Sequence, residues 1–310
     1  DDIVVMEKGH VVETGTAREI LEAPKHPYTR MLIDSQPSGT PAPVPEQAQP
    51  VIETTDLRVH FPILAGVLKT QVGSIKAVDG VTLSIREGET LGIVGESGCG
   101  KSTTGKAIMR LNPIKSGSVT FKGTDITHLK GETLRALRQG LQMIFQDPVS
   151  SINPRRTIGD VVSEPLEIWG KTDGADALVD RVLGDVGLDP EIARPKRRHE
   201  FSGGQRQRIS IARALSSQPE VIICDEPTSA LDVSVQAQVL NLLKALQKDF
   251  GLTYLFITHD LAVVSTMANR IGVLNQGVLV EEQDTADLFS KPQQDYTKML
   301  LSAAPKIEFS

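Results

Sequence analysis

The sequence predicts an α/β fold with a parallel core sheet flanked by helices, an antiparallel β subdomain and an inserted helical subdomain. Segments rich in β-forming residues come first, and short apolar runs then alternate with helical patterns. Continuous apolar runs are typical of parallel strands covered on both faces. The β-rich segments are 51–61, 77–85 and 90–94, and the apolar runs are 142–145, 221–224 and 254–257. The predicted helices are 101–110, 203–215, 233–249 and 261–268, with a polar helical insert at about 150–200.

Composition limits the classes of function. With 310 residues, 39% of them hydrophobic, the chain is long enough for one large or two ordinary domains. A net charge of −6 and an aromatic content of 4% argue against nucleic acid as a partner, because such sites are basic and use stacking side chains. No apolar run reaches the roughly 20 residues of a membrane-spanning helix. Cys99 and Cys224 fit no metal or disulfide pattern and predict reduced thiols.

A pattern near the N-terminus recurs 268 residues later without a gap. The first copy contains Gly9, Glu13, Pro24, Tyr28, Thr29, Met31 and Leu32, and the second contains Gly277, Glu281, Pro292, Tyr296, Thr297, Met299 and Leu300. Two unrelated strand-turn-helix pieces are the alternative. We favour a remnant of a preceding homologous domain at residues 1–35, and the opening without an initiator Met also suggests a fragment.

The domain boundaries follow from a change in composition. Residues 36–50 are rich in proline, which predicts an extended linker that could span about 40 Å at roughly 3.1 Å per residue. The whole domain then covers 51–310, with a C-terminal extension from about 284 to 310.

The strand at 90–94 runs into a glycine-rich turn that matches the phosphate-loop pattern G-x-x-x-x-G-K-S/T, also called Walker A. Glycines let backbone N–H groups turn toward phosphates, and the N-terminus of the following helix adds positive charge. Lys101 is predicted to reach the β- and γ-phosphates, and the Ser102 hydroxyl to bind Mg²⁺. An ordinary glycine-rich turn is the alternative. The predicted nucleotide-binding residues here are Gly95, Glu96, Ser97, Gly98, Cys99, Gly100, Lys101, Ser102 and Thr103.

Two adjacent acids follow the apolar run at 221–224. Asp225 suits a bound Mg²⁺ ion, and Glu226 suits the positioning and polarisation of an attacking water. A pair of acids at a strand end is more often a solvated loop. Behind a phosphate loop, the pair instead predicts a hydrolase that uses ATP and Mg²⁺.

Further motifs stand in a fixed order around these. Phe201 leads into Ser202, Gly203, Gly204 and Gln205, a run that resembles the signature sequence of ABC-type ATPases with Phe in place of the usual Leu. Small residues before a helix also make a general anion site or a simple N-cap.

The ABC resemblance covers residues 51–310, and residues 1–35 resemble the end of a second copy. It implies that Gln146 is the Q-loop glutamine, which contacts Mg²⁺ and water, that Asp232 closes the D-loop, and that His259 is the switch histidine at the γ-phosphate. A lone histidine after a strand is otherwise more often structural.

Two residues of the predicted site are the least secure. Phe61 follows the first strand and corresponds best to the adenine-stacking aromatic residue of the family, but residues 62–75 are inserted behind it. A core role is the alternative for Phe61. Cys99 lies near a lysine and a helix N-terminus, which predicts a depressed thiol pKa and inhibition by alkylation with protection by ATP. A packing role is the alternative for Cys99.

The sequence is most similar to ATPase subunits of bacterial oligopeptide, dipeptide, nickel and glutathione importers. Segments 77–81, 95–100, 145–148 and 152–155 and the repeated tail carry this resemblance. It implies a head-to-tail pair with a homologous ATPase domain fused upstream, or a homodimer of isolated domains. It also implies two membrane permease subunits, indirectly a periplasmic substrate-binding protein, and a peripheral position on the cytoplasmic face of the inner membrane.

Three alternative functions fit the sequence less well. A tandem ATPase acting on ribosomes joins its halves with a long charged helix, whereas residues 36–50 are short and proline-rich. A DNA-repair ATPase needs a long coiled coil between phosphate loop and signature, but only 100 residues separate Ser102 from Ser202. Glu226 and His259 argue against a catalytically silent module.

Overall fold

A six-stranded sheet forms the centre of the molecule. The computed structural model describes residues 2–34, 40–65, 70–229 and 231–303. The strand order in this sheet is β12-β11-β5-β10-β9-β8, and all neighbours are parallel except the β11–β12 pair. The predicted parallel core sheet is therefore confirmed. Its strands are β5 (Thr90–Val94), β8 (Leu141–Ile144), β9 (Val221–Asp225), β10 (Thr253–Ile257), β11 (Arg270–Asn275) and β12 (Val278–Asp284).

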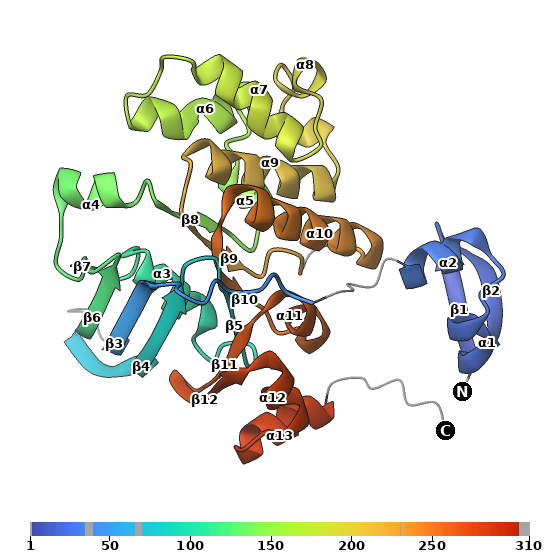
Figure 1. Ribbon diagram of the computed structural model, residues 1–310, viewed down its shortest axis with the longest axis horizontal. Coiled ribbons are helices and arrows are strands. Elements are labelled where there is room, and N and C mark those ends of the chain that lie inside the picture. The colour runs from blue at the N-terminus through green and yellow to red at the C-terminus, as the bar shows by residue number, and fades with distance from the viewer. Residues whose placement is uncertain (1, 35–39, 66–69, 230, 304–310) are drawn as a thin grey trace.

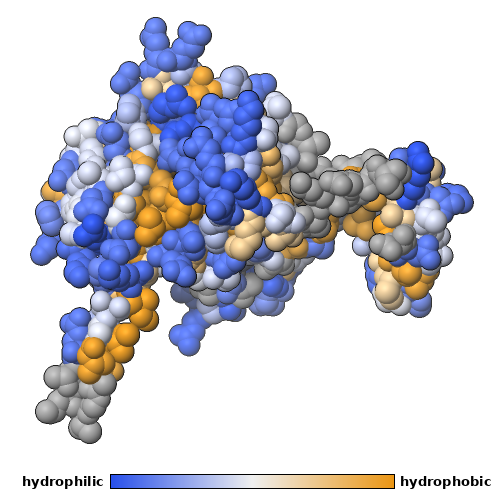
Figure 2. Space-filling model, turned by 90° about the horizontal axis from the view of Figure 1, so that it is seen from below, coloured by the Kyte–Doolittle hydropathy of each residue, from blue (hydrophilic) through white to orange (hydrophobic). Residues whose placement is uncertain are grey.

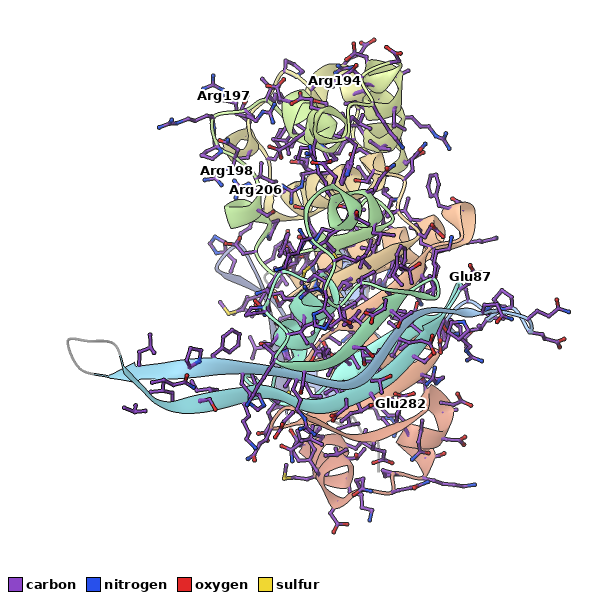
Figure 3. The ribbon with its side chains drawn as sticks, turned by 90° about the vertical axis from the view of Figure 1, so that its left-hand side faces the viewer. Glu87, Arg194, Arg197, Arg198, Arg206 and Glu282 are labelled. Carbon is purple, nitrogen blue, oxygen red and sulfur yellow. The ribbon has the colours of Figure 1, made fainter. Side chains whose placement is uncertain are left out.

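A second, antiparallel sheet has the order β4-β3-β6-β7 and lies beside the first (Figure 1). Its two long strands reach beyond the predicted ends, because the inserted residues 62–75 continue the pairing out to Ala65 and Thr70. The result is a hairpin that projects from the body of the molecule (Figure 3). The strands are β3 (Pro50–Ala65), β4 (Thr70–Arg86), β6 (Ser116–Phe121) and β7 (Thr124–Asp125).

Helices cover both faces of the central sheet (Figure 1). Gly105 lets α3 lie close to the sheet, since an added Cβ there would be 2.9 Å from Ile257 and 3.1 Å from Ile223. A buried cluster joins α3 to both sheets, and a second cluster joins α10 to the helical insert. These helices are α3 (Lys101–Ile108), α10 (Val233–Phe250) and α11 (Leu261–Met267), whereas α4 (Gly131–Leu137) lies to one side of the central sheet (Figure 1).

The predicted helical insert forms a compact unit in which α6 and α7 pack on α9. Thr157 begins α6 with a reciprocal capping box to Asp160. Arginine side chains gather at the end of this unit that carries the signature (Figure 3). The elements are α5 (Pro148–Ser151), α6 (Ile158–Ile168), α7 (Ala175–Asp185), α8 (Pro190–Ala193), a 3₁₀ helix (Arg198–Glu200) and α9 (Gly203–Ser216).

The N-terminal residues form a small module that repeats the structure of residues 270–303, which include most of the C-terminal extension. Each copy is a strand pair followed by two short helices, and both pairs carry an irregularity after the fourth residue of the first strand. The repeat found in the sequence is therefore also a structural repeat. The first copy is β1 (Asp2–Glu7), β2 (His10–Thr16), α1 (Ala17–Glu22) and α2 (Pro27–Asp34), and the second is β11, β12, α12 (Thr285–Ser290) and α13 (Asp295–Ala303).

The predicted linker lies partly outside the described residues, at 35–39. Its second half runs along the domain: the Asn269 side chain donates to the Ala42 carbonyl at 2.7 Å, and Glu87 N–H donates to the Gln49 carbonyl at 3.0 Å. This half of the linker is thus held against the domain it precedes. Among the described helices, none is long and apolar enough to cross a membrane.

Candidate nucleotide site

Four parallel strands bring the predicted catalytic residues to one edge of the sheet. The phosphate loop follows β5, Glu226 follows β9, and His259 and Gln146 come shortly after β10 and β8. These four strands are adjacent in the order β5-β10-β9-β8. Ligands of open parallel sheets bind at the carboxyl ends of the strands, and this is where the residues meet.

The phosphate loop needs glycine at its two ends. Gly95 and Gly100 have φ values of 150° and 109°, and an added Cβ would lie 2.2 Å from the Leu274 carbonyl oxygen and 2.1 Å from that of Ala77. Backbone contact at both points leaves no room for a side chain. The Lys101 ammonium donates to the carbonyls of Gly95 and Glu96 at 2.8 and 2.9 Å, so its charge lies inside the loop.

Ser102 and Asp225 form the predicted magnesium pair. The Ser102 hydroxyl, in the first turn of α3, donates to Asp225 Oδ1 at 2.6 Å across 123 residues of sequence. Burial raises the pKa of Asp225, although the Ser102 hydroxyl and the charge of Lys106 oppose the rise. A hydroxyl and a carboxylate held this close are oxygen ligands that fit Mg²⁺.

Glu226 lies between the other two predicted catalytic residues. Gln146 Nε2 donates to Glu226 Oε2 at 2.9 Å, and His259 Nδ1 lies 3.3 Å from Glu226 Oε1. The Glu226 backbone has a φ of +46°, a left-handed conformation that costs about 1–2 kcal/mol in a residue with a side chain. Strain of this kind gathers at functional sites.

The signature residues lie in the helical unit, at the N-terminus of α9. Ser202 and Gln205 form a capping box, with the Ser202 side chain accepting from Gln205 N–H and Gln205 Oε1 accepting from Ser202 N–H. Gly203 and Gly204 are close to Leu231 and to Val235 of α10, respectively. The structure therefore places the signature beside the D-loop, and no described contact joins it to the phosphate loop of the same chain.

Asp232 and Phe61, both predicted site residues, have structural roles that need no ligand. Asp232 is the N-cap of α10, where Val235 N–H donates to its carboxylate at 3.0 Å. Phe61 lies in β3 and packs, half-buried, against the core, so its stacking on adenine stays a prediction. Thr103 is half-buried on α3.

The expectation of a depressed thiol pKa at Cys99 is wrong. Burial raises the pKa of Cys99, and this outweighs the lowering effect of Lys101, whose Nζ is 4.0 Å from the sulfur. The side chain is only 7% exposed. Packing under the loop, the alternative from the sequence, is the role that the structure supports.

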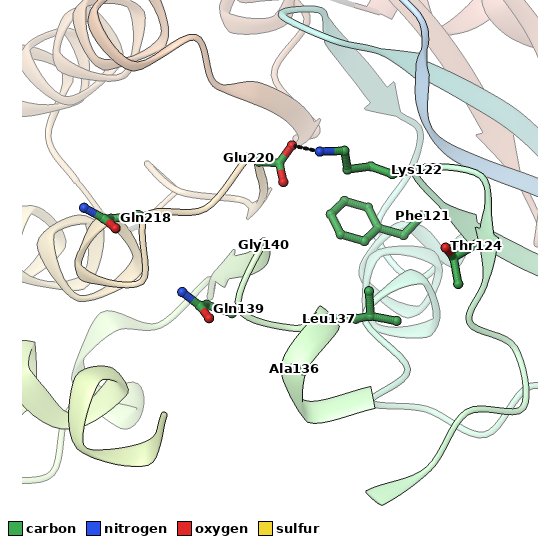
Figure 4. A pocket seen from close by; sticks show the side chains of 9 residues that line it. All are labelled: Phe121, Lys122, Thr124, Ala136, Leu137, Gln139, Gly140, Gln218 and Glu220. Atoms are coloured by element: carbon green, nitrogen blue, oxygen red, sulfur yellow. Dashed lines mark hydrogen bonds and ion pairs between the residues drawn. The ribbon is translucent and has the colours of Figure 1, made fainter. Parts of the chain in front are cut away.

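One residue at the site lies outside every motif of the sequence. Tyr296 of α13 accepts a hydrogen bond from Glu96 N–H of the phosphate loop at 3.3 Å. The two residues are 200 positions apart, so no local pattern relates them; the only signal was that Tyr296 belongs to the repeat. By contrast, an open cavity of about 310 Å³, whose lining includes the ion-paired Lys122 and Glu220, is lined by none of the predicted site residues (Figure 4).

Comparison with known proteins identifies two families that match the chain. A model of the ABC transporter family matches residues 78–229, and one of the oligopeptide/dipeptide transporter C-terminal region matches residues 12–56 and 280–310. The fold and site define an ATP-binding cassette, a class that binds nucleotide.

Individual relatives place the chain within that class. It is 47% identical to the peptidoglycan transport ATP-binding protein YejF of Agrobacterium fabrum and 44% to the glutathione import ATP-binding protein GsiA of Escherichia coli. These alignments cover 99% of this chain and 57% and 54% of the relatives, so the chain spans little more than half of their length. The chain belongs to the ABC transporter ATP-binding proteins, in the group with the oligopeptide/dipeptide transporter C-terminal region.

Solved structures agree on the fold. The dimeric ATP-binding cassette MJ0796, in a post-hydrolysis state bound to ADP and Pi, has a TM-score of 0.66 and 29% identity, over 76% of this chain and 98% of that one. CbiO1 of Clostridium perfringens, part of the transporter complex cbiONQ, has a TM-score of 0.66 and 25% identity over 78% of this chain and 91% of its own.

Proposed function

We propose that this chain hydrolyses ATP with Mg²⁺ to power the import of short peptides, glutathione among them, across the bacterial inner membrane. The observation that carries the proposal is the position of Glu226, within 3.3 Å of both Gln146 and His259, directly after the strand that presents Asp225 to Ser102. Relatives that are 44–47% identical are named for glutathione import and peptidoglycan transport.

The chain's own groups divide the work of hydrolysis. The amides of the phosphate loop and Lys101 bind the β- and γ-phosphates. The Glu226 carboxylate accepts a hydrogen bond from the attacking water and aligns it with the γ-phosphorus, while the bond to the bridging oxygen breaks and ADP leaves. His259 and Gln146 hold Glu226 from either side and reach the γ-phosphate and the water.

Ser102 and Asp225 would hold Mg²⁺, with Gln146 as a further ligand. The ion supplies neutralisation of charge on the β- and γ-phosphate oxygens. Asp225 is buried beside Ser102, and a cation at this point would offset the cost of its buried charge.

A second ATPase domain completes the site in this proposal. Among the described residues, no hydrogen bond joins the signature at Ser202–Gln205 to the phosphate loop of its own chain, as expected if it serves a partner's ATP. Residues 2–34 repeat the structure of residues 270–303, and the same family model matches part of each segment. We therefore infer an upstream ATPase domain as the partner, on the cytoplasmic face of the inner membrane. The pair would act with two membrane permease subunits and, indirectly, with a periplasmic substrate-binding protein.

The function is tested with Glu226→Gln, which keeps the size of the side chain and removes its charge. We expect kcat for ATP hydrolysis to fall about 100-fold or more, because a positioned base contributes about 10²–10⁴-fold. Binding of MgATP, measured by calorimetry, is expected to persist. In cells, uptake of labelled glutathione and dipeptides is expected to be lost.

Glu220→Gln is the matched control, because Glu220 precedes the same strand and its side chain is 48% exposed. It is expected to hydrolyse ATP and support uptake as the unaltered protein does. Undiminished turnover in Glu226→Gln would overturn the role of Glu226. Loss of turnover with normal peptide uptake would overturn the transport assignment.

A further inference from the structure

The C-terminal helix α13 touches the phosphate loop directly. Its Tyr296 hydroxyl accepts the Glu96 N–H at 3.3 Å, while the carbonyls of Gly95 and Glu96 accept from Lys101. The first two residues of the loop are thus held on one side by Lys101 and on the other by a residue outside the predicted site. Burial raises the pKa of Tyr296, so the phenol stays neutral at physiological pH.

The same helix also reaches the segment that carries the switch histidine. Tyr296 and Leu300 pack against a buried cluster that includes Val94, the residue before the loop, and Leu261 packs on the same cluster two positions after His259. A cavity of about 430 Å³ lies between these parts and is lined by Glu96, His259 and Leu300, among others. The C-terminal extension therefore contacts both sides of the nucleotide site.

A carboxylate fixes α13 in this position. Glu281 of β12 accepts the N–H groups of Gln293 and Gln294 at 2.7 and 3.0 Å, just before the helix begins. The N-terminal module uses the same device, with Glu13 accepting the N–H groups of Lys25 and His26 at 2.7 and 3.0 Å.

The N-terminal and C-terminal copies of the repeat differ in the surroundings of their tyrosines. Tyr28 corresponds to Tyr296, and its module has no phosphate loop among the described residues. The shared cradle is therefore structural, and the contact with Glu96 is the feature that the C-terminal copy adds. This makes Tyr28 a built-in control for Tyr296.

We propose that Tyr296 is a positioning residue for nucleotide binding, through which the C-terminal extension holds the start of the phosphate loop. The inference rests on the proposed binding of ATP at residues 95–103. It predicts that the hydroxyl sets the affinity for nucleotide and leaves the chemical step, which depends on Glu226, unchanged.

The test compares Tyr296→Phe with Tyr28→Phe in the full 310-residue chain. Phe keeps the packing of the ring and removes only the hydroxyl. We expect Tyr296→Phe to weaken MgATP binding about threefold to tenfold, the effect of one hydrogen bond, with kcat within twofold of the unaltered protein. Hydrogen exchange at the amides of residues 94–97 is expected to accelerate in this variant alone.

Each outcome has a distinct meaning. Equal affinity and equal exchange in Tyr296→Phe and the unaltered chain would overturn this inference. So would an equal loss in Tyr28→Phe, because the effect would then come from the cradle. A chain that binds no MgATP at all before any substitution would instead overturn the proposed function.

Discussion

Two aspartates of the predicted site have pKa values that are shifted in opposite directions. Burial raises the pKa of Asp225 above its ordinary value of 3.8. The folded chain therefore retains this proton to higher pH than the unfolded chain, and stability falls as pH rises from 3.8 through the raised pKa. Asp232 shows the reverse: the Ser234 hydroxyl and Val235 N–H lower its pKa, so its contribution is present above 3.8 and is lost as pH falls.

Substitution of the two aspartates is expected to change stability in opposite directions. Without Mg²⁺ at pH 7, Asp225→Asn is expected to stabilise the chain by about 0.5–2 kcal/mol, as substitutions at strained functional sites often do. Asp232→Ala is expected to destabilise it by about 1 kcal/mol through loss of the N-cap. Urea unfolding measures both, and a less stable Asp225→Asn protein would contradict the conclusion that Ser102 and Lys106 offset only part of the cost of burying this charge.

Gly204 of the signature allows α9 and α10 to pack closely against each other. A Cβ at Gly204 would lie 2.3 Å from Val235 Cγ1, whereas one at Gly203 would lie 3.5 Å from Leu231 Cδ2, an ordinary contact. Valine in a helix has one strongly preferred rotamer and cannot turn aside easily. Packing, in addition to any contact with ATP, therefore requires glycine at 204.

We expect Gly204→Ala to cost about 1–3 kcal/mol of stability through overpacking between α9 and α10. Gly203→Ala is the matched control and is expected to change stability by less than about 0.5 kcal/mol. Equal unfolding midpoints in urea for the two variants would show that the helices adjust without cost.

The sequence predicted the central strands well and the hairpin poorly, for one reason. Apolar runs such as 254–257 are local signals of a covered parallel strand, and β10 confirms this one. The continuation of β3 past Phe61 depends on cross-strand pairs such as Ile63 with Gly73, which no local pattern encodes. The Tyr296 contact was missed for the same reason, whereas phosphate-loop and strand-end motifs were visible because they are short.

The whole molecule has two projecting parts, the β3–β4 hairpin and the N-terminal module (Figure 2). In the module, Val4, Met6 and Val11 are 55–56% exposed. Their counterparts include Leu274 of β11, which is buried because β11 pairs with both β5 and β12. Among the described strands, β1 pairs with β2 alone, whereas β11 has a partner on each side. We infer that a strand of an upstream domain, equivalent to β5, pairs with the free edge of β1.

Hydrogen exchange tests this inference. An isolated strand pair is marginally stable, so amides of β1 are expected to exchange at least about 100-fold faster than those of β11 in this chain. Joining the upstream domain is expected to protect β1. Equal protection of the two strands in the 310-residue chain would show that the module needs no such neighbour.

The proposed binding of MgATP depends most on Lys101 and the phosphate loop around it. Calorimetry of MgATP binding tests this directly, with Lys101→Ala compared with Lys122→Ala, whose lysine is exposed beside Glu220. We predict binding by the unaltered chain and by Lys122→Ala, and at least about tenfold weaker binding by Lys101→Ala, since a charge-assisted hydrogen bond is lost. Equal affinity in all three proteins, or no binding by any of them, would contradict the account.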